Sequence, residues 1–278
     1  MNATQASAPL GGSAPNAVGS VGVAYLLHLA DNAVVLGQRN AEWCGHGPIL
    51  EEDIALANVS LDHIGQARLL YQLAAARMGG GASEDSLAYF RDETAFRNYT
   101  LLELPHHGPL VGYAASDRDY AVTIVRNFFY GALMVLVWDA LTRSADADLA
   151  AIAAKSLKEA RYHLHHAADW VVRLGDGTDE SHARAQAAVD HLFRYTEEFW
   201  LPSPAETEAV ASGAGVDVAS LRAAWDALVD ETLAEATLRR PAVRGYVPEG
   251  KLGRHSEHLG YLLGEMQGLA RAHPGATW

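Results

Sequence analysis

Cysteine and positive charge are both scarce in this chain. Cys44 is the single cysteine among 278 residues, so an internal disulfide is excluded. The 21 lysines and arginines are outnumbered by 34 aspartates and glutamates, which gives a formal net charge of −13. Such a charge repels phosphate groups, so binding to nucleic acid or to a membrane surface is not expected. No basic segment followed by an apolar run opens the sequence, and we therefore predict a cytoplasmic protein.

Alternation of apolar and polar residues with period two, the pattern of strands, is not sustained anywhere in the chain. Apolar residues recur instead at helical spacing, and the sequence predicts an all-α fold. The expected helices span about residues 21–40, 48–78, 87–96, 117–143, 147–174, 179–200, 218–237 and 256–271. Residues 1–20, rich in Ala, Gly, Ser, Pro and Asn, are predicted to be a flexible tail, and residues 21–272 a single helical domain.

The helix expected at 117–143 is apolar on nearly every side, which raises the alternative of a membrane span. Its longest stretch without charged or strongly polar groups, Phe128–Trp138, is too short to cross a bilayer. A buried central helix is therefore predicted.

The lengths of the connections predict how the helices pair. Short connections near Cys44–Pro48 and Ser144–Asp146 would each join two long helices into a hairpin, and residues 82–116 would form a long crossover between the hairpins. Two hairpins joined by a crossover are the ferritin-like variant of the four-helix bundle. The sequence therefore predicts a ferritin-like bundle with additional C-terminal helices.

Glutamate is missing where a ferritin-like di-iron protein would need it. Such proteins carry Glu-x-x-His on two helices and a further Glu on each of the other two. At matching places this chain has Ser60-Leu61-Asp62-His63 and Ala160-Arg161-Tyr162-His163. The histidines have thus kept their positions without the carboxylates that would bridge two metal ions.

Counting from the loops identifies the residues expected at the same level of the bundle. A first loop centred near position 45 places Ser60 and His63 level with residues 27–30, one position short of Asp31. A second loop near 145 places Ala160 and His163 level with residues 127–130, which include no carboxylate. The degenerate di-iron positions are therefore Asp31, Ser60, His63, Asn127, Tyr130, Ala160 and His163. This set predicts no metal, no cofactor and no catalytic residue in the chain.

Two interpretations of the histidines remain open at this point. Asp31, His63, Glu159 and His163 could together hold one ion, because Glu159 lies one helical turn before His163. Alternatively, both histidines could be hydrogen-bonded within a polar seam, with Glu159 or Asp31 as partners. A second histidine-rich segment, residues 254–258, is interpreted as a structural or interface element.

Four runs, at residues 42–48, 56–68, 158–163 and 257–267, together resemble the structural C subunits of bacterial phenylacetyl-CoA epoxidases, also called ring-1,2-phenylacetyl-CoA oxygenases. The resemblance covers about residues 20–272. It implies a ferritin-like subunit without metal in phenylacetate breakdown, which packs against a homologous di-iron catalytic subunit. It also implies a hetero-oligomer with another small subunit and with a reductase that carries FAD and an iron–sulfur cluster and uses NADPH. A catalytically active or iron-binding ferritin-like di-iron protein remains the alternative, as does a helical adaptor for an unrelated partner.

Overall fold

The computed structural model describes residues 19–108, 118–242 and 247–276. Residues 1–18 of the expected tail, residues 109–116 of the expected crossover and residue 117 of the next expected helix lie outside this part. Across the described ranges the chain is built from helices, and its only strand-like pairing is an isolated bridge between Glu249 and Arg254. The all-α prediction is confirmed.

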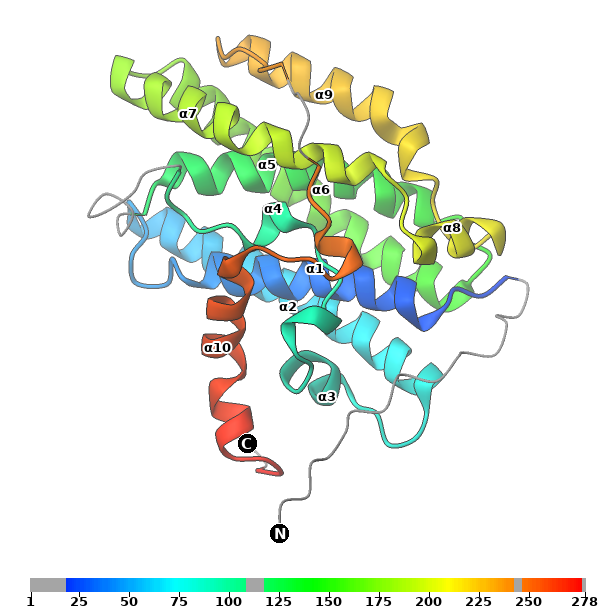
Figure 1. The fold of residues 1–278 in the computed structure, drawn as a ribbon. Helices are drawn as coiled ribbons and strands as arrows, with labels where there is room; N and C mark the ends of the chain where they lie inside the picture. The colour runs from blue at the N-terminus through cyan, green and yellow to red at the C-terminus, as the bar shows by residue number, and fades with distance from the viewer. Residues whose placement is uncertain (1–18, 109–117, 243–246, 277–278) are drawn as a thin grey trace.

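Two long antiparallel hairpins form the bundle (Figure 1). In the first, α1 (Val23–Ala41) packs along α2 (Leu50–Met78), and in the second, α5 (Tyr120–Leu141) packs along α6 (Ala147–Gly175). The described parts of the crossover contain α3 (Glu84–Tyr89), the 3₁₀ turn η1 (Glu93–Ala95) and α4 (Thr100–Glu103). This is the predicted ferritin-like arrangement, in which α2 of one hairpin lies against α6 of the other.

Asp146 ties the two hairpins together at one end. Its side chain caps α6 by accepting a hydrogen bond from the N–H of Leu149 at 3.2 Å. The same carboxylate accepts two hydrogen bonds from the guanidinium of Arg77 in α2, at 2.7 and 2.9 Å, and one from the N–H of Val21 at 3.0 Å. One residue thus fixes the end of α2 and the start of α6 relative to each other.

Helix α5 is the central helix that the sequence predicts. It is long and apolar enough to cross a membrane, with a mean hydropathy of 1.6 over its most apolar window, but 89% of that window is buried inside the bundle. Its one charged side chain in the core, Arg126, donates hydrogen bonds to the carbonyl of Leu104 at 2.5 Å and to His106 at 3.0 Å. The apolar composition of α5 therefore reflects packing on all sides.

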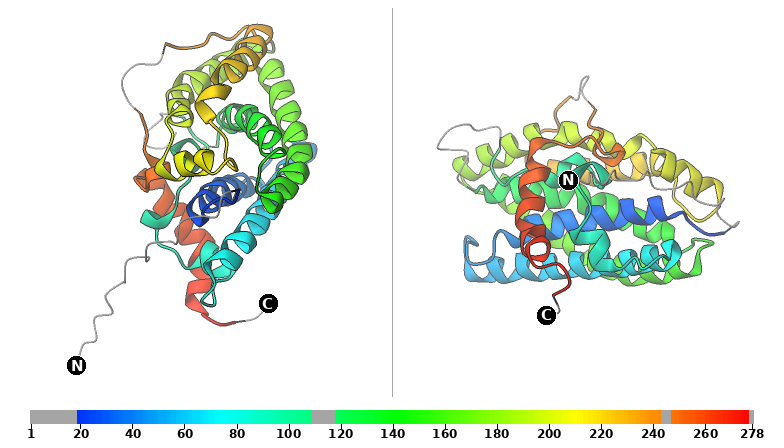
Figure 2. Two further views of the ribbon diagram at one scale, coloured as in Figure 1. Left: turned by 90° about the vertical axis from the view of Figure 1, so that its right-hand side faces the viewer. Right: turned by 60° about the horizontal axis from the view of Figure 1, so that its bottom comes forward.

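The C-terminal half adds helices to two sides of the bundle (Figure 2). Helices α7 (Asp179–Leu192) and α9 (Arg222–Glu235) pack on α5 and α6, while α8 (Pro204–Ala211) and α10 (Glu257–Ala272) pack on α1. The 3₁₀ segments η3 (Phe193–Trp200), η4 (Val218–Leu221) and η5 (Gly250–Leu252) connect them. Trp225 of α9 anchors this layer, because its ring contacts Phe129 of α5 and its Nε1–H donates to the Phe129 carbonyl at 3.0 Å.

Four elements of the described structure differ from the prediction. One is the helix expected at 218–237, which begins as the 3₁₀ segment η4. The helix expected at 179–200 changes to 3₁₀ geometry at Phe193, and the one expected at 87–96 forms earlier, as α3 followed by η1. Helix α8 is not among the helices that the sequence predicts. Its start carries a clear signal all the same: Ser203 and Glu206 form a capping box, and Pro204 occupies the first turn.

Candidate functional site

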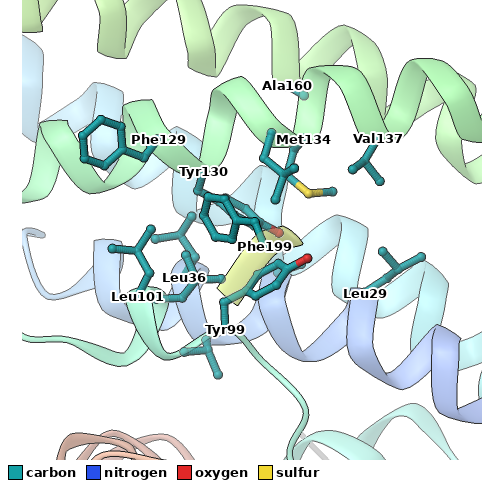
Figure 3. Packing of buried hydrophobic residues seen from close by; sticks show 14 of the residues in the cluster. Leu29, Leu36, Tyr99, Leu101, Phe129, Tyr130, Met134, Val137, Ala160 and Phe199 are labelled. Carbon is teal, nitrogen blue, oxygen red and sulfur yellow. The ribbon is translucent and has the colours of Figure 1, made fainter. Parts of the chain in front are cut away.

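The four bundle helices meet around a small void at the level of the two histidines. Leu36 comes from α1; Val59, His63 and Gln66 from α2; Asn127, Tyr130, Gly131, Met134 and Trp138 from α5; and Ala160, His163 and His166 from α6. The void has about 10 Å³, close to the least that holds a single water molecule. Figure 3 shows Leu36, Tyr130 and Met134 among the buried side chains that fill the space between α1 and α5. We call these lining residues the histidine centre.

His63 and His163, two of the three histidines of the centre, lie against each other. Their ring centroids are 4.9 Å apart, and each residue is 6% exposed. His163 donates from Nε2 to the carboxylate of Asp62 at 2.9 Å, which bridges α6 to α2. Burial lowers the pKa of His163 although Asp62 favours its charged form, and burial together with the neighbouring His163 lowers the pKa of His63 well below its usual range. Both rings are therefore neutral near pH 7.

The residues predicted for the second hairpin lie at the level of the void, as expected. Asn127 and Tyr130 of α5 line the same void as Ala160 and His163 of α6, as counting from the loop near position 145 predicts. Gly131 of α5 faces Leu164 of α6 in this register, and a Cβ on Gly131 would lie in ordinary contact with it, 3.4 Å from the Leu164 Cα. The neutral residues Asn127 and Ala160 therefore occupy this side of the centre.

The first hairpin has a different register from the one that counting predicts. A Cβ on Gly37 would lie 3.2 Å from the carbonyl oxygen of Ser60 and 3.3 Å from the Cβ of His63, so Gly37 of α1, rather than residues 27–30, is level with them. The reason is that turns continue past the end of α1: the N–H groups of Cys44 and His46 still bond to carbonyls three residues back. The chain thus reverses direction later than position 45.

As a consequence, Asp31 lies away from the centre. Its carboxylate accepts hydrogen bonds from the hydroxyl of Tyr71 at 2.5 Å, from the guanidinium of Arg91 and from the N–H of Arg97 at 2.8 Å. Both of its oxygens are used by these donors. Leu36, an apolar residue, is the α1 residue that lines the void instead.

The remaining candidates have local partners. The hydroxyl of Ser60 donates to the carbonyl of Leu56 in its own helix at 2.8 Å. Glu159 accepts from Gln66 at 2.9 Å and lies 3.5 Å from Lys155. The structure therefore does not gather Asp31, His63, Glu159 and His163 around one point, and it gives His163 a partner, Asp62, that sequence reasoning missed although it directly precedes His63.

The donor set of the centre does not fit a dinuclear iron site. Such a site needs bridging carboxylates, and the four helices contribute Leu36, Ser60, Asn127 and Ala160 at this level. Among the residues that the structure describes, no group of three or more His, Cys, Asp or Glu side chains could hold a metal ion. The absence of bound metal remains a prediction for metal analysis.

A second buried polar cluster lies where the chain leads into α10. It consists of Glu103, Glu198, Glu206, Lys251 and His255, and we call it the C-terminal clamp. Lys251 lies 2.9 Å from Glu206 and donates its backbone N–H to Glu198 at 2.9 Å. His255 bonds to Glu103 at 2.9 Å; burial alone would lower the pKa of His255, but Glu103 outweighs it and the pKa is raised. The histidine-rich segment 254–258 thus contributes a structural contact, as predicted.

Two comparisons with known proteins bear on the identity of the chain. The model of a family described as "Phenylacetic acid catabolic protein" matches residues 13–278. The C subunit of the 1,2-phenylacetyl-CoA epoxidase of Escherichia coli (strain K12) is 45% identical over 255 residues, which cover 92% of this chain and 98% of that protein.

Proposed function

The chain belongs to the phenylacetic acid catabolic protein family, and we propose that it is a non-catalytic structural subunit of a phenylacetyl-CoA epoxidase. The resemblance found in four sequence runs is thereby confirmed at the level of the family. A subunit acts with other subunits, so we place this chain in a hetero-oligomer. Its partners would be a homologous di-iron catalytic subunit, another small subunit and a reductase.

One observation carries the non-catalytic part of the proposal. Both hairpins of the ferritin-like bundle are complete, yet Leu36, Ser60, Asn127 and Ala160 stand where carboxylates would have to bridge two metal ions. The bundle is thus preserved without the groups that redox chemistry with oxygen would require.

In this proposal the cofactors belong to the partners. The catalytic subunit would hold the two irons, and the reductase would carry FAD and an iron–sulfur cluster and take electrons from NADPH. The role of this chain would be mechanical: helix-on-helix packing against the catalytic bundle holds the iron-ligand helices of that subunit in place.

Metal analysis and reconstitution test the proposal together. The chain, purified after growth in iron-supplemented medium, is expected to contain far less than one iron per molecule by plasma mass spectrometry. Adding it to the catalytic subunit and the reductase should raise the rate of phenylacetyl-CoA epoxidation. An iron content close to two per chain would contradict the proposal and would favour an active di-iron protein.

A further inference from the structure

The outward side of α2 carries a row of large apolar side chains. Leu50, Ile54 and Leu61 are 72%, 52% and 65% exposed, and Ile64 continues the row at 39%. Their spacings of four, seven and three residues place them on one line along the helix. Apolar side chains gathered in this way on a protein surface mark an interaction site.

Helix α6 extends this row sideways. Tyr162 is 57% exposed and its ring stacks against His166, which bonds to Glu52 of α2 at 2.9 Å. Tyr162 therefore lies beside the seam between the two helices. We call the outward sides of α2 and α6, marked by Leu50, Ile54, Leu61 and Tyr162, the α2–α6 face.

The added C-terminal helices cover other sides of the bundle. Helices α7 and α9 pack on α5 and α6, and α8 and α10 pack on α1. The view along the bundle in Figure 2 shows α2 and α6 next to each other at the edge of the molecule, away from these layers. The α2–α6 face is thus the side of the bundle that the described C-terminal helices leave open.

On the α6 side of the face, positive charges lie near the apolar row, against the charge of the whole chain. The sequence has three lysines, of which Lys251 is buried in the C-terminal clamp. The other two, Lys155 and Lys158, are exposed on α6 together with Arg161, close in sequence to Tyr162. Of these, Lys155 pairs with Glu159 at 3.5 Å and Arg161 with Asp139 at 3.8 Å. A surface that fits this face has apolar residues flanked by carboxylates.

The face is large enough for a stable complex. Helices α2 and α6 have 29 residues each. At 1.5 Å per residue each is about 43 Å long, and two adjacent helices are about 20 Å wide. The resulting outline of roughly 860 Å² includes the parts of α2 and α6 that α3, α7 and α9 contact. It is of the same order as the ~800 Å² that each partner contributes to a specific interface.

We propose that the α2–α6 face docks the catalytic subunit of the epoxidase through an apolar helical surface flanked by acidic residues. The inference rests on the proposed function and adds to it the location and chemistry of the interface. Leu61 lies at the middle of the apolar row and is the residue whose change should matter most.

The test compares two substitutions of exposed apolar residues in the full-length chain. Leu61→Asp is expected to weaken binding to the purified catalytic subunit about 30-fold or more in calorimetric titration, the effect of a central interface residue. Tyr261→Asp is the matched control, because Tyr261 is 77% exposed on α10, outside the α2–α6 face, and its change should leave the Kd within about twofold. Circular dichroism and thermal unfolding of both variants should match the unaltered chain, since neither side chain is buried.

The outcomes separate this inference from the proposed function. If the unaltered chain does not bind the catalytic subunit, both are wrong. If it binds and Leu61→Asp has no effect, the proposed function stands and the location of the interface is wrong. If Leu61→Asp separates a dimer of this chain while its affinity for the catalytic subunit is unchanged, the face joins two copies and the inference fails.

Discussion

The histidine centre and the C-terminal clamp are both buried and polar, but they are built in opposite ways. In the centre the two histidines are neutral, and within the described part of the chain the Nδ1 atoms of His63 and His163 have no hydrogen-bond partner. In the clamp, three carboxylates are buried, and each accepts at least two hydrogen bonds. The molecule thus keeps buried carboxylates where they join segments and lacks them where a metal would be needed.

Charge explains this difference. Four carboxylates close together inside a bundle repel one another unless cations lie between them, so without metal they would destabilise the fold. In the clamp the cation is part of the chain: Lys251 compensates Glu206, and backbone N–H groups of Lys251 and Thr100 donate to Glu198. In the clamp, buried charge attaches the C-terminal segment to the bundle.

Removing the ion pair between Glu206 and Lys251 in the clamp should lower the free energy of unfolding more than any other change considered below. Glu206→Ala leaves the ammonium of Lys251 buried without its carboxylate and removes the capping box of α8, so we expect a loss of about 3–5 kcal/mol in the free energy of unfolding. Urea denaturation followed by circular dichroism measures it. Glu235→Ala on the exposed end of α9 is the control and should stay within about 0.5 kcal/mol. A cost below about 1 kcal/mol for Glu206→Ala would show that the clamp contributes little.

Glu198 of the clamp and His63 of the centre should also respond to pH with opposite sign. Burial raises the pKa of Glu198 to about 7, although the N–H groups of Lys251 and Thr100 donate to it. The folded state then favours the protonated acid, so this group's contribution to stability is present below its unfolded pKa and is lost as pH rises toward 7. Over that interval the loss amounts to about 3 kcal/mol. For His63 the folded pKa is lowered, so its contribution is present above the unfolded pKa near 6.5 and is lost as pH falls.

Two variants isolate these contributions. In urea unfolding at a series of pH values, Glu198→Gln should remove the decline in stability between about pH 4.5 and 7, while His63→Phe should reduce the decline below about pH 6.5. Phenylalanine suits this position because Leu36, Tyr130 and Met134 provide an apolar lining. If the stability profiles of both variants against pH match that of the unaltered chain, neither Glu198 nor His63 sets the pH dependence of stability.

The hairpins and half of the centre could be predicted because they depend on local spacing. Helical periodicity and the Gly-Pro and Ser-Ala-Asp connections identify the four long helices, and the spacing of three residues keeps Ala160 and His163 on one side of α6. The second hairpin has a short connection, so counting from its loop brings Asn127 to the right level. Turns also continue past the end of α5, through Arg143 and Ser144, but the loop centre near position 145 already lies beyond them.

The first hairpin and the clamp depend on contacts that counting does not capture. Turns continuing through Cys44 and His46 shift the level of α1 against α2, which replaces Asp31 by Leu36 at the centre. The clamp brings together Glu103, Glu198 and Lys251, which are far apart in sequence and share no motif. Its single local signal is the capping box of Ser203 and Glu206, which predicts a helix start but not the lysine that pairs with it.

Substitution of Ser60 should change the free energy of unfolding least. It tests whether a polar residue beside the histidine centre contributes to stability. Its hydroxyl donates to the Leu56 carbonyl, one turn earlier in the same helix, so the bond joins no two helices. Ser60→Ala removes this local bond but gains helix propensity, and the change in unfolding free energy should stay within about 0.5 kcal/mol. The same urea titration used for Glu206→Ala measures it. A loss above about 2 kcal/mol would mean that Ser60 stabilises the packing of other helices around the void. The contrast between a centre that contributes little to stability and a clamp that contributes much would then be wrong.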